Sequence, residues 1–173
     1  IALRAKPGVS AETVASISAR VHPLVLELVD RPDPQVGLEG KFSYQHGMAV
    51  GLIDGAAFPA QYTDDRVHDP TVAAVRERIN ATVDSGMAED AAEVTLALRD
   101  GISYRVIITN ATGAPENPLT DAQLEEKFRD LTGDILPKAR VERLLSLLWN
   151  LDQVTHIGEV LALARPRRRS IRQ

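Results

Sequence analysis

The sequence contains no cysteine among its 173 residues. Disulfide bonds, thiolate catalysis and cysteine-ligated metals are therefore excluded, and the absence fits a reducing compartment, so we expect a cytoplasmic protein. Aromatic residues make up only 4% of the chain, which argues against a stacking platform for single-stranded nucleic acid. No apolar run approaches the roughly 18 residues of a membrane-spanning helix, and no secretory signal is visible. We expect neither a nucleic acid nor a membrane among the partners.

Standard catalytic signatures are missing as well. No histidine pairs with another His, Asp or Glu at a metal-binding spacing, so we predict no metal site. The segment 37–41 is too short for a phosphate-binding loop, and the sequence has no Gly-x-Ser-x-Gly nucleophile motif. The histidines that were considered are His22, His46, His68 and His156.

The composition that remains is that of an ordinary globular protein, 44% hydrophobic and 25% charged. Its length suits one domain with a core, or one domain with an appended piece. The net charge is −4, but arginines gather near the end. We predict that residues 165–173 form a basic flexible tail, with a nucleic-acid or membrane-surface arm as the alternative. These arginines are Arg165, Arg167, Arg168, Arg169 and Arg172.

The clearest β pattern lies over residues 93–109. Two runs of alternating apolar residues flank Asp100-Gly101, which predicts an antiparallel hairpin with a type I′ turn. Residues 81–86 are a candidate further strand. The alternating residues are Val94, Leu96 and Leu98 before the turn, and Tyr104, Val106 and Ile108 after it.

The first third of the chain is predicted from similar patterns. Residues 13–21 and 24–29 are interpreted as an extended pair or one long bent strand. A helix is predicted over residues 43–57, because its apolar residues recur at three and four positions. A loop follows over 58–69, and Asp69-Pro70 then starts a second helix, with Asp as its cap. The apolar stripes are Met48, Ala49, Leu52, Ile53 and Ala56 in the first helix, and Val72, Val75 and Ile79 in the second.

The last third is helical. Thr120 and Gln123 form a capping box that opens a helix to about Leu131, and two more helices are predicted over 138–149 and 153–164. Together these patterns predict an α+β domain over residues 1–118, with helices flanking an antiparallel sheet, followed by a helical segment over 119–164. The residues expected to face inward are Val141, Leu144, Leu145 and Leu148, then Val154, Ile157, Val160 and Leu161.

The strongest functional candidate is the segment Lys41–His46. It lies at the start of a predicted helix, where unpaired backbone N–H groups and the helix dipole favour an anion. Lys41 is a cation suited to a carboxylate, and His46 can transfer a proton near neutral pH. We predict Lys41 and His46 as catalytic residues, and Ser43 and Gln45 as substrate-binding residues. The alternative is a solvated lysine and a histidine that is satisfied at a helix start.

Residues 36–55 resemble the central motif of the MmgE/PrpD family, in which a Lys-Phe-Ser segment runs into an Ala-rich helix that ends in Asp-Gly. Here these are Lys41-Phe42-Ser43 and Asp54-Gly55. Later parts of the sequence agree with the family in order and spacing. They are Tyr62-Thr63-Asp64, Asp69-Pro70, the Asp100-Gly101 hairpin, Gly113-Ala114-Pro115, Pro118-Leu119-Thr120 and Glu126-Lys127-Phe128.

The resemblance implies a small α+β domain inserted before the C-terminus of a larger all-helical domain, to which the helices after residue 120 would belong. The sequence begins in what looks like the last turn of a helix, over residues 1–5, so we expect it to be part of a longer protein. Its N-terminal helical part would then be a missing partner. The active site of the family lies between the two domains, and family members are commonly dimers.

The resemblance also implies a chemistry that needs no metal or organic cofactor. A base removes a proton next to a carboxylate, and the step that follows makes the enzyme a dehydratase, a decarboxylase or an epimerase. We expect a lyase, a dehydratase acting on a small di- or tricarboxylate of the 2-methylcitrate type. A decarboxylase or isomerase of the same family is one alternative. A non-catalytic domain that binds a partner through the leucine-rich helices of 120–164 is another.

Overall fold

A computed structural model describes residues 1–166 of the chain. The chain divides into two compact units, the first over Ile1–Pro118 and the second from Leu119 onward. Each unit is described by itself. Of the predicted basic tail over 165–173, only residues 165 and 166 are described, and the remainder lies outside the described residues.

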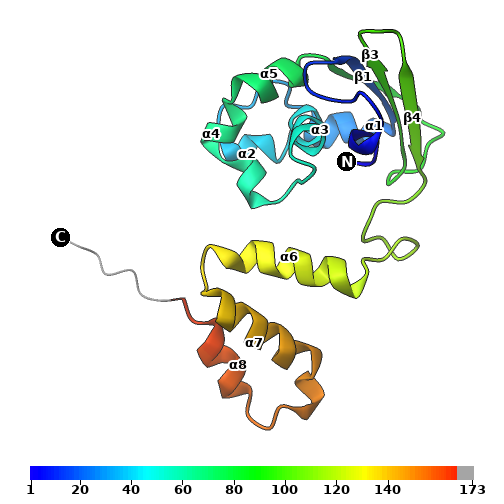
Figure 1. Ribbon diagram of the computed structural model, residues 1–173. Coiled ribbons are helices and arrows are strands. Elements are labelled where there is room, and N and C mark those ends of the chain that lie inside the picture. The colour runs from blue at the N-terminus through cyan, green and yellow to red at the C-terminus, as the bar shows by residue number, and fades with distance from the viewer. Residues whose placement is uncertain (167–173) are drawn as a thin grey trace. The chain divides into compact units, whose positions relative to one another are not determined.

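The first unit is a four-stranded sheet with helices gathered on one face (Figure 1). The strand order is β2-β1-β3-β4. The β elements are β1 Val14–Val21, β2 Ile79–Val83, β3 Ala92–Leu98 and β4 Ser103–Ile108. The helical elements are η1 Ala2–Ala5, α1 Pro23–Val29, α2 Gly37–Gly40, α3 Tyr44–Ile53, η2 Pro59–Tyr62, α4 Asp64–Val67 and α5 Pro70–Arg76.

The sheet is mixed, which corrects the prediction of an antiparallel sheet. Strand β1 pairs in parallel with β2, with Ile17 opposite Ile79, and antiparallel with β3, with Ile17 opposite Leu96. The parallel pair arises because the connection from β1 to β2 contains helices α1 to α5, and such a crossover returns the chain in the same direction. The hairpin of β3 and β4 is antiparallel, as predicted.

The turn of this hairpin differs from the predicted type I′. Gly101 has φ +91°, but Asp100 does not have positive φ. The Gly101 N–H donates to the Leu98 carbonyl, and Leu98 and Ile102 then pair across the loop. A type I turn followed by a left-handed glycine gives this arrangement, and it needs only one residue with positive φ.

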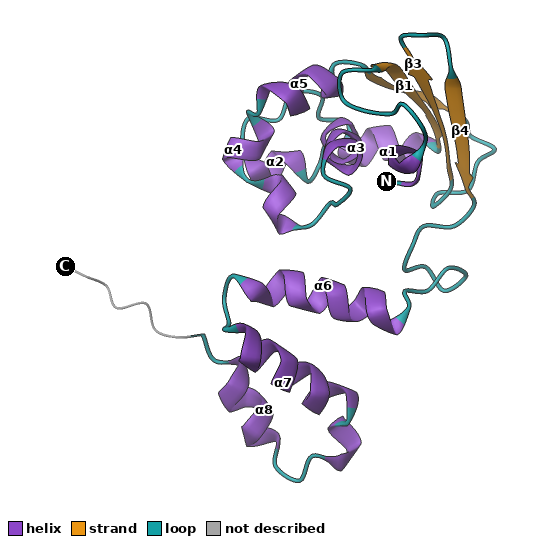
Figure 2. Cartoon of the chain, viewed as in Figure 1, coloured by secondary structure: helices purple, strands orange, loops and turns teal. Residues whose placement is uncertain are grey.

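Residues 23–29 form helix α1, so the prediction of an extended segment over 24–29 was wrong. Pro23 occupies the first turn, where its missing N–H is harmless, and His22 Nδ1 accepts the Leu24 N–H at 3.2 Å. The helix predicted over 43–57 is shorter, at Tyr44–Ile53. Residues 58–69, predicted as a loop, contain the short helices η2 and α4, the second capped by Thr63. Figure 2 shows these short helices beside α2.

The core of the first unit lies between the sheet and helices α3 and α5. Leu96 is 1% exposed, and it meets residues from helix and strand alike. Helix α3 contributes Val50, which the predicted stripe did not include, alongside Ala49 and Leu52. The other buried members are Leu3, Val14, Ile17, Val72, Val75, Ile79 and Leu98.

The second unit is a helical hairpin with an added helix. Its elements are α6 Asp121–Gly133, α7 Lys138–Trp149, η3 Leu151–Gln153 and α8 Ile157–Ala164. The Thr120 capping box is present as predicted. Three inward assignments were wrong, because Leu148, Ile157 and Leu161 are 41%, 57% and 59% exposed. The buried members are Leu136, Val141, Leu144, Leu145, Leu147 and Val160. Over residues 1–166, no helix has both the length and the apolar character needed to cross a membrane.

Replacing Leu96 by alanine is expected to lower the free energy of unfolding by about 2–5 kcal/mol, because it leaves a cavity in the core. Urea denaturation followed by circular dichroism measures this change. Ile107→Ala is the matched control, since Ile107 lies on the neighbouring strand β4 and is 59% exposed; it should change the free energy by less than about 1 kcal/mol. Equal losses for the two variants would contradict this description of the core.

Candidate functional site

The segment that carries Lys41 joins two helices through a tight series of backbone hydrogen bonds. The N–H of Lys41 donates to Leu38 O, that of Phe42 to Glu39 O and that of Ser43 to Gly40 O. The next helix, α3, begins with Ser43 as its cap, and Ser43 Oγ accepts the His46 N–H at 3.0 Å. The sequence therefore places Lys41 before the helix and His46 in its first turn, as predicted.

The four predicted site residues divide by burial. The Lys41 side chain is exposed, whereas Ser43, Gln45 and His46 are 3%, 4% and 0% exposed. Ser43 Oγ donates to Gln45 Oε1, and Gln45 Nε2 donates to Asp30 Oδ1 at 2.7 Å. The three buried residues are thus brought together with one another. No hydrogen bond or ion pair of the described residues joins the Lys41 ammonium to the His46 ring.

His46 binds the backbone of η2. Its Nε2 lies 2.8 Å from Gln61 O, and because a carbonyl oxygen can only accept, Nε2 carries the proton. Nδ1 is buried and has no partner among the described residues. The Tyr62 ring lies beside the imidazole, at 5.4 Å between centroids.

The environment keeps this histidine neutral. Burial lowers the pKa of His46, and the nearby charges of Arg76 and Arg66 lower it further, against the opposing effects of the Gln61 carbonyl and Asp54. A buried imidazolium in this position would lack solvent and face two cations. At neutral pH the ring is therefore a hydrogen-bond donor to Gln61 and carries no charge.

Glycines allow α2 to approach residues 62–67 closely. A Cβ on Gly37 would lie 2.0 Å from Tyr62 O, so only glycine fits there. The Gly37 N–H donates to Asp64 Oδ1 at 2.7 Å. At the other end of α2, a Cβ on Gly40 would lie 3.1 Å from a Val67 methyl group. Helix α2, which leads directly into Lys41, is therefore held against this second segment.

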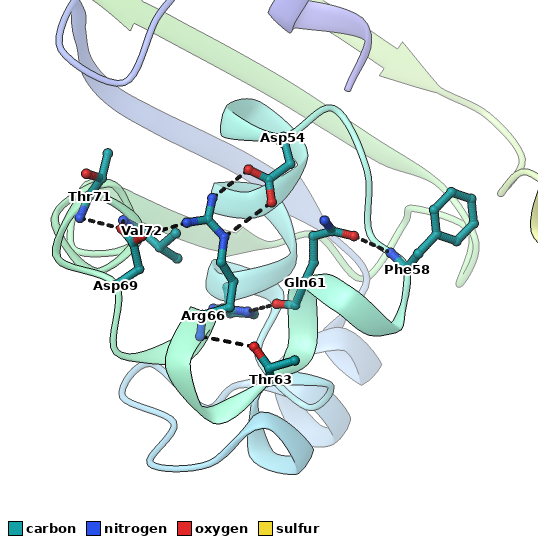
Figure 3. A network of polar contacts seen from close by, with 9 residues as sticks. Asp54, Phe58, Gln61, Thr63, Arg66, Asp69, Thr71 and Val72 are labelled. Atoms are coloured by element: carbon teal, nitrogen blue, oxygen red, sulfur yellow. Dashed lines mark hydrogen bonds and ion pairs between the residues drawn. The ribbon is translucent and has the colours of Figure 1, made fainter. Parts of the chain in front are cut away.

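An ion-pair network fastens that second segment to the far end of α3, and prediction from sequence did not assign it. Arg66 Nη2 and Nε contact the Asp54 carboxylate at 2.5 and 3.2 Å, and Nη1 lies 2.7 Å from Asp69 Oδ2 (Figure 3). Asp69 also caps α5, as predicted, accepting the N–H groups of Thr71 and Val72. The two amides lower the pKa of Asp69, that of Val72 most strongly, and Arg66 lowers it further.

Two surface hollows flank the segment. One, of about 460 Å³, is lined by Tyr44, Gln45, Arg76 and Asn80, among others. The other, of about 420 Å³, includes Phe42 and Leu38 in its lining. Lys41 lines neither hollow. Within residues 1–166, no group of three His, Asp or Glu side chains is arranged to hold a metal ion.

Replacing Gly37 by alanine should separate α2 from Tyr62 and destabilise the first unit by about 1–3 kcal/mol, since backbone atoms must shift to admit the methyl group. Thermal unfolding measures the loss. Gly51→Ala is the control, because its Cβ would meet only ordinary contacts, 3.6 Å from Ile1; an alanine inside α3 should raise stability by up to about 1 kcal/mol. A Gly37→Ala protein as stable as Gly51→Ala would be incompatible with this contact.

The lowered pKa of His46 predicts a specific dependence of stability on pH. The unfolded histidine titrates near 6.5 and the folded one below it, so the unfolded state binds the proton first as the pH falls. The contribution of neutral His46 to the free energy of unfolding is therefore complete above about pH 6.5 and decreases below it. Denaturation at pH 7.5 and pH 5 should show a smaller decrease for His46→Gln, which cannot titrate, than for the unaltered chain. Identical slopes for the two proteins would contradict the neutral assignment.

Comparison with known proteins identifies the family of the chain. Residues 1–153 match the family described as the MmgE/PrpD C-terminal domain. The chain is 23% identical over 133 residues to cis-aconitate decarboxylase of Mus musculus, which covers 75% of this chain and 27% of that protein. It is 26% identical over 156 residues to mitochondrial 2-methylcitrate dehydratase of Yarrowia lipolytica, covering 82% and 29%. The chain thus spans less than a third of the length of these relatives. Since the family match extends over most of the sequence, the chain belongs to the MmgE/PrpD family, as its C-terminal domain.

Proposed function

We propose that this chain is the C-terminal portion of a lyase, a dehydratase that acts on a small di- or tricarboxylate of the 2-methylcitrate type. Family membership over residues 1–153 is the observation that carries the proposal. The two relatives described above are named as a dehydratase and a decarboxylase. Both names describe lyases of carboxylate substrates.

Lys41 is the residue that we assign to the substrate. It is exposed, and it follows a helix that is fixed by close backbone contact at Gly37. An ammonium group whose backbone is fixed in this way can bind a carboxylate as a point charge. Removal of a proton next to a carboxylate builds negative charge on the substrate, and a nearby cation stabilises that charge. Lys41 would therefore bind the substrate and lower the barrier to proton abstraction.

The roles predicted for the other three residues stay predictions. Ser43 and Gln45 are buried and bonded to neighbouring groups, so a direct contact with substrate would require one of these bonds to open. The acid–base role predicted for His46 would likewise require the ring to leave Gln61.

A decarboxylase is the second candidate within the family. The decarboxylases of Mus musculus and Homo sapiens are each 23% identical to the chain over 133 residues, close to the 26% of the dehydratase. An epimerase would share the same proton abstraction and differ only in how the proton returns. Product analysis separates these reactions: water loss, release of carbon dioxide, or an inverted centre without loss of mass.

We also propose that the second unit packs on an all-helical domain and that the protein is a cytoplasmic homodimer. The packing is supported by apolar side chains that the unit leaves exposed, including Ile135, Ile157 and Leu161 at 57–59%. The same surface favours the alternative of a non-catalytic domain that binds a partner. Light scattering of the protein that carries this chain tests the dimer, and a monomeric mass at micromolar concentration would overturn that part.

Replacing Lys41 by alanine in the protein that carries this chain should lower kcat/KM for 2-methylcitrate or cis-aconitate by about 10- to 150-fold. This range corresponds to the roughly 1.5–3 kcal/mol of one hydrogen bond to a charged group. Lys41→Arg should retain more activity than Lys41→Ala, because the charge remains. Lys6→Ala removes an exposed lysine elsewhere in the unit and should leave turnover intact. Unchanged turnover in Lys41→Ala would refute the assignment.

A further inference from the structure

We propose that Asp64 is a positioning residue for Lys41: its carboxylate holds the first residue of α2 and so fixes the short helix that ends at the lysine. The inference rests on the proposed function, because it presumes that Lys41 binds the substrate. Asp64 itself would not contact the substrate.

Helix α2 cannot hold Lys41 in place by itself. It spans only four residues, Gly37–Gly40, and a helix of this length is far below the roughly 12–15 residues at which isolated helices become even marginally stable in water. Its geometry must therefore come from contacts with the rest of the unit. The position of the lysine backbone depends on those contacts.

Asp64 supplies the one side-chain hydrogen bond that joins α2 to the 59–67 segment within the described residues, 2.7 Å from the Gly37 N–H to Oδ1. Glu39, the acidic residue of α2, does not bond to this segment; its carboxylate accepts from Arg31 and from the Gln35 N–H. The other contacts of α2 with this segment are close packing around its glycines, which sets how near the two segments lie. The Asp64 carboxylate adds a directional, charge-assisted hydrogen bond to that packing.

Asp64 is itself well anchored. It is the first residue of α4, and its carbonyl accepts the His68 N–H. Through Arg66, the same short helix is tied to Asp54 at the end of α3. The start of α3 is tied to Gln61 through His46. Both ends of α3 are thus bound to the segment that presents Asp64. Lys41 lies between α2 and α3, and both of these helices are bonded to that segment.

Loss of the Asp64 carboxylate removes this bond, loosens the start of α2 and lets the lysine shift. A displacement of about 1 Å in a substrate-positioning group can lower the rate by up to about 100-fold. We expect Asp64→Ala to lower kcat/KM by about 10- to 100-fold in the protein that carries this chain. Asp64→Asn keeps an Oδ1 acceptor for Gly37 and should restore most of the activity.

Asp65→Ala is the matched control. Asp65 is the next residue in the same first turn of α4, so its removal takes away the same charge at the same helix end. Its side chain makes none of the hydrogen bonds of the described residues. Activity should therefore stay within about twofold of the unaltered protein, since an exposed charge of this kind contributes little.

A double-mutant cycle with Lys41 separates positioning from general damage. If Asp64 acts through Lys41, then Asp64→Ala should cause little further loss of kcat/KM in a Lys41→Ala background. Full additivity of the two losses would overturn the inference, and so would a fully active Asp64→Ala protein. An unchanged Lys41→Ala protein would instead overturn the proposed function, so the two failures are distinguishable.

A second measurement keeps the inference testable if Asp64→Ala does not fold. The serine side chain of Asp64→Ser places its oxygen one bond closer to the backbone, so it does not reach the Gly37 N–H. A polar group nevertheless stays at the helix start. Hydrogen exchange of the Gly37 amide should be at least about tenfold faster in Asp64→Ser than in Asp64→Asn, with lower activity in parallel. Equal exchange, or equal activity, in the two variants would overturn the inference.

Discussion

The contact of Gly37 with the Tyr62 carbonyl is the constraint on which the candidate site depends. It lets two stretches of backbone meet without a side chain between them. Two hydrogen bonds of the site use this proximity. The carboxylate of Asp64 reaches the Gly37 amide, and the His46 ring reaches the Gln61 carbonyl, because the two segments already lie against each other. A close backbone approach of this kind is specific, since it depends on one residue type at one position.

The packing of these two segments also gives His46 and Lys41 different environments. His46 becomes buried and neutral, whereas Lys41, five residues earlier, stays exposed. Arg66 is compensated by two aspartates, Asp54 and Asp69. Lys41 forms none of the ion pairs of the described residues, so its charge stays available for a ligand.

Much of the fold could be predicted from local pattern. The hairpin, the start of α5 and the capping box of α6 depend on residues close in sequence, and all three are present. Helix α1 was missed because a seven-residue apolar segment has no distinctive period; Pro23 was its only strong local signal. The parallel pairing of β1 and β2 depends on the path of the intervening helices, which no local pattern records.

The candidate site, too, could be predicted only where it depends on residues close in sequence. Ser43 as a helix cap follows from its type and position, and Lys41 before α3 follows from the boundary. The burial of His46 does not, because the residues that cover it lie about 15 positions later in the chain. Asp64 and Arg66 carried a weak signal, since Thr63 followed by two acidic residues is typical of a capped helix start. Their partners Gly37 and Asp54 are set by tertiary structure alone.

The central place of β1 in the sheet has a consequence for synthesis on the ribosome. The strand is synthesised before both of its neighbours, since Ile17 pairs with Ile79 and Leu96. At roughly 5–20 residues per second, several seconds pass before either neighbour exists. During that interval both edges of β1 lack hydrogen-bonding partners, a state prone to aggregation. The sheet can therefore close around β1 only after β3 has been synthesised.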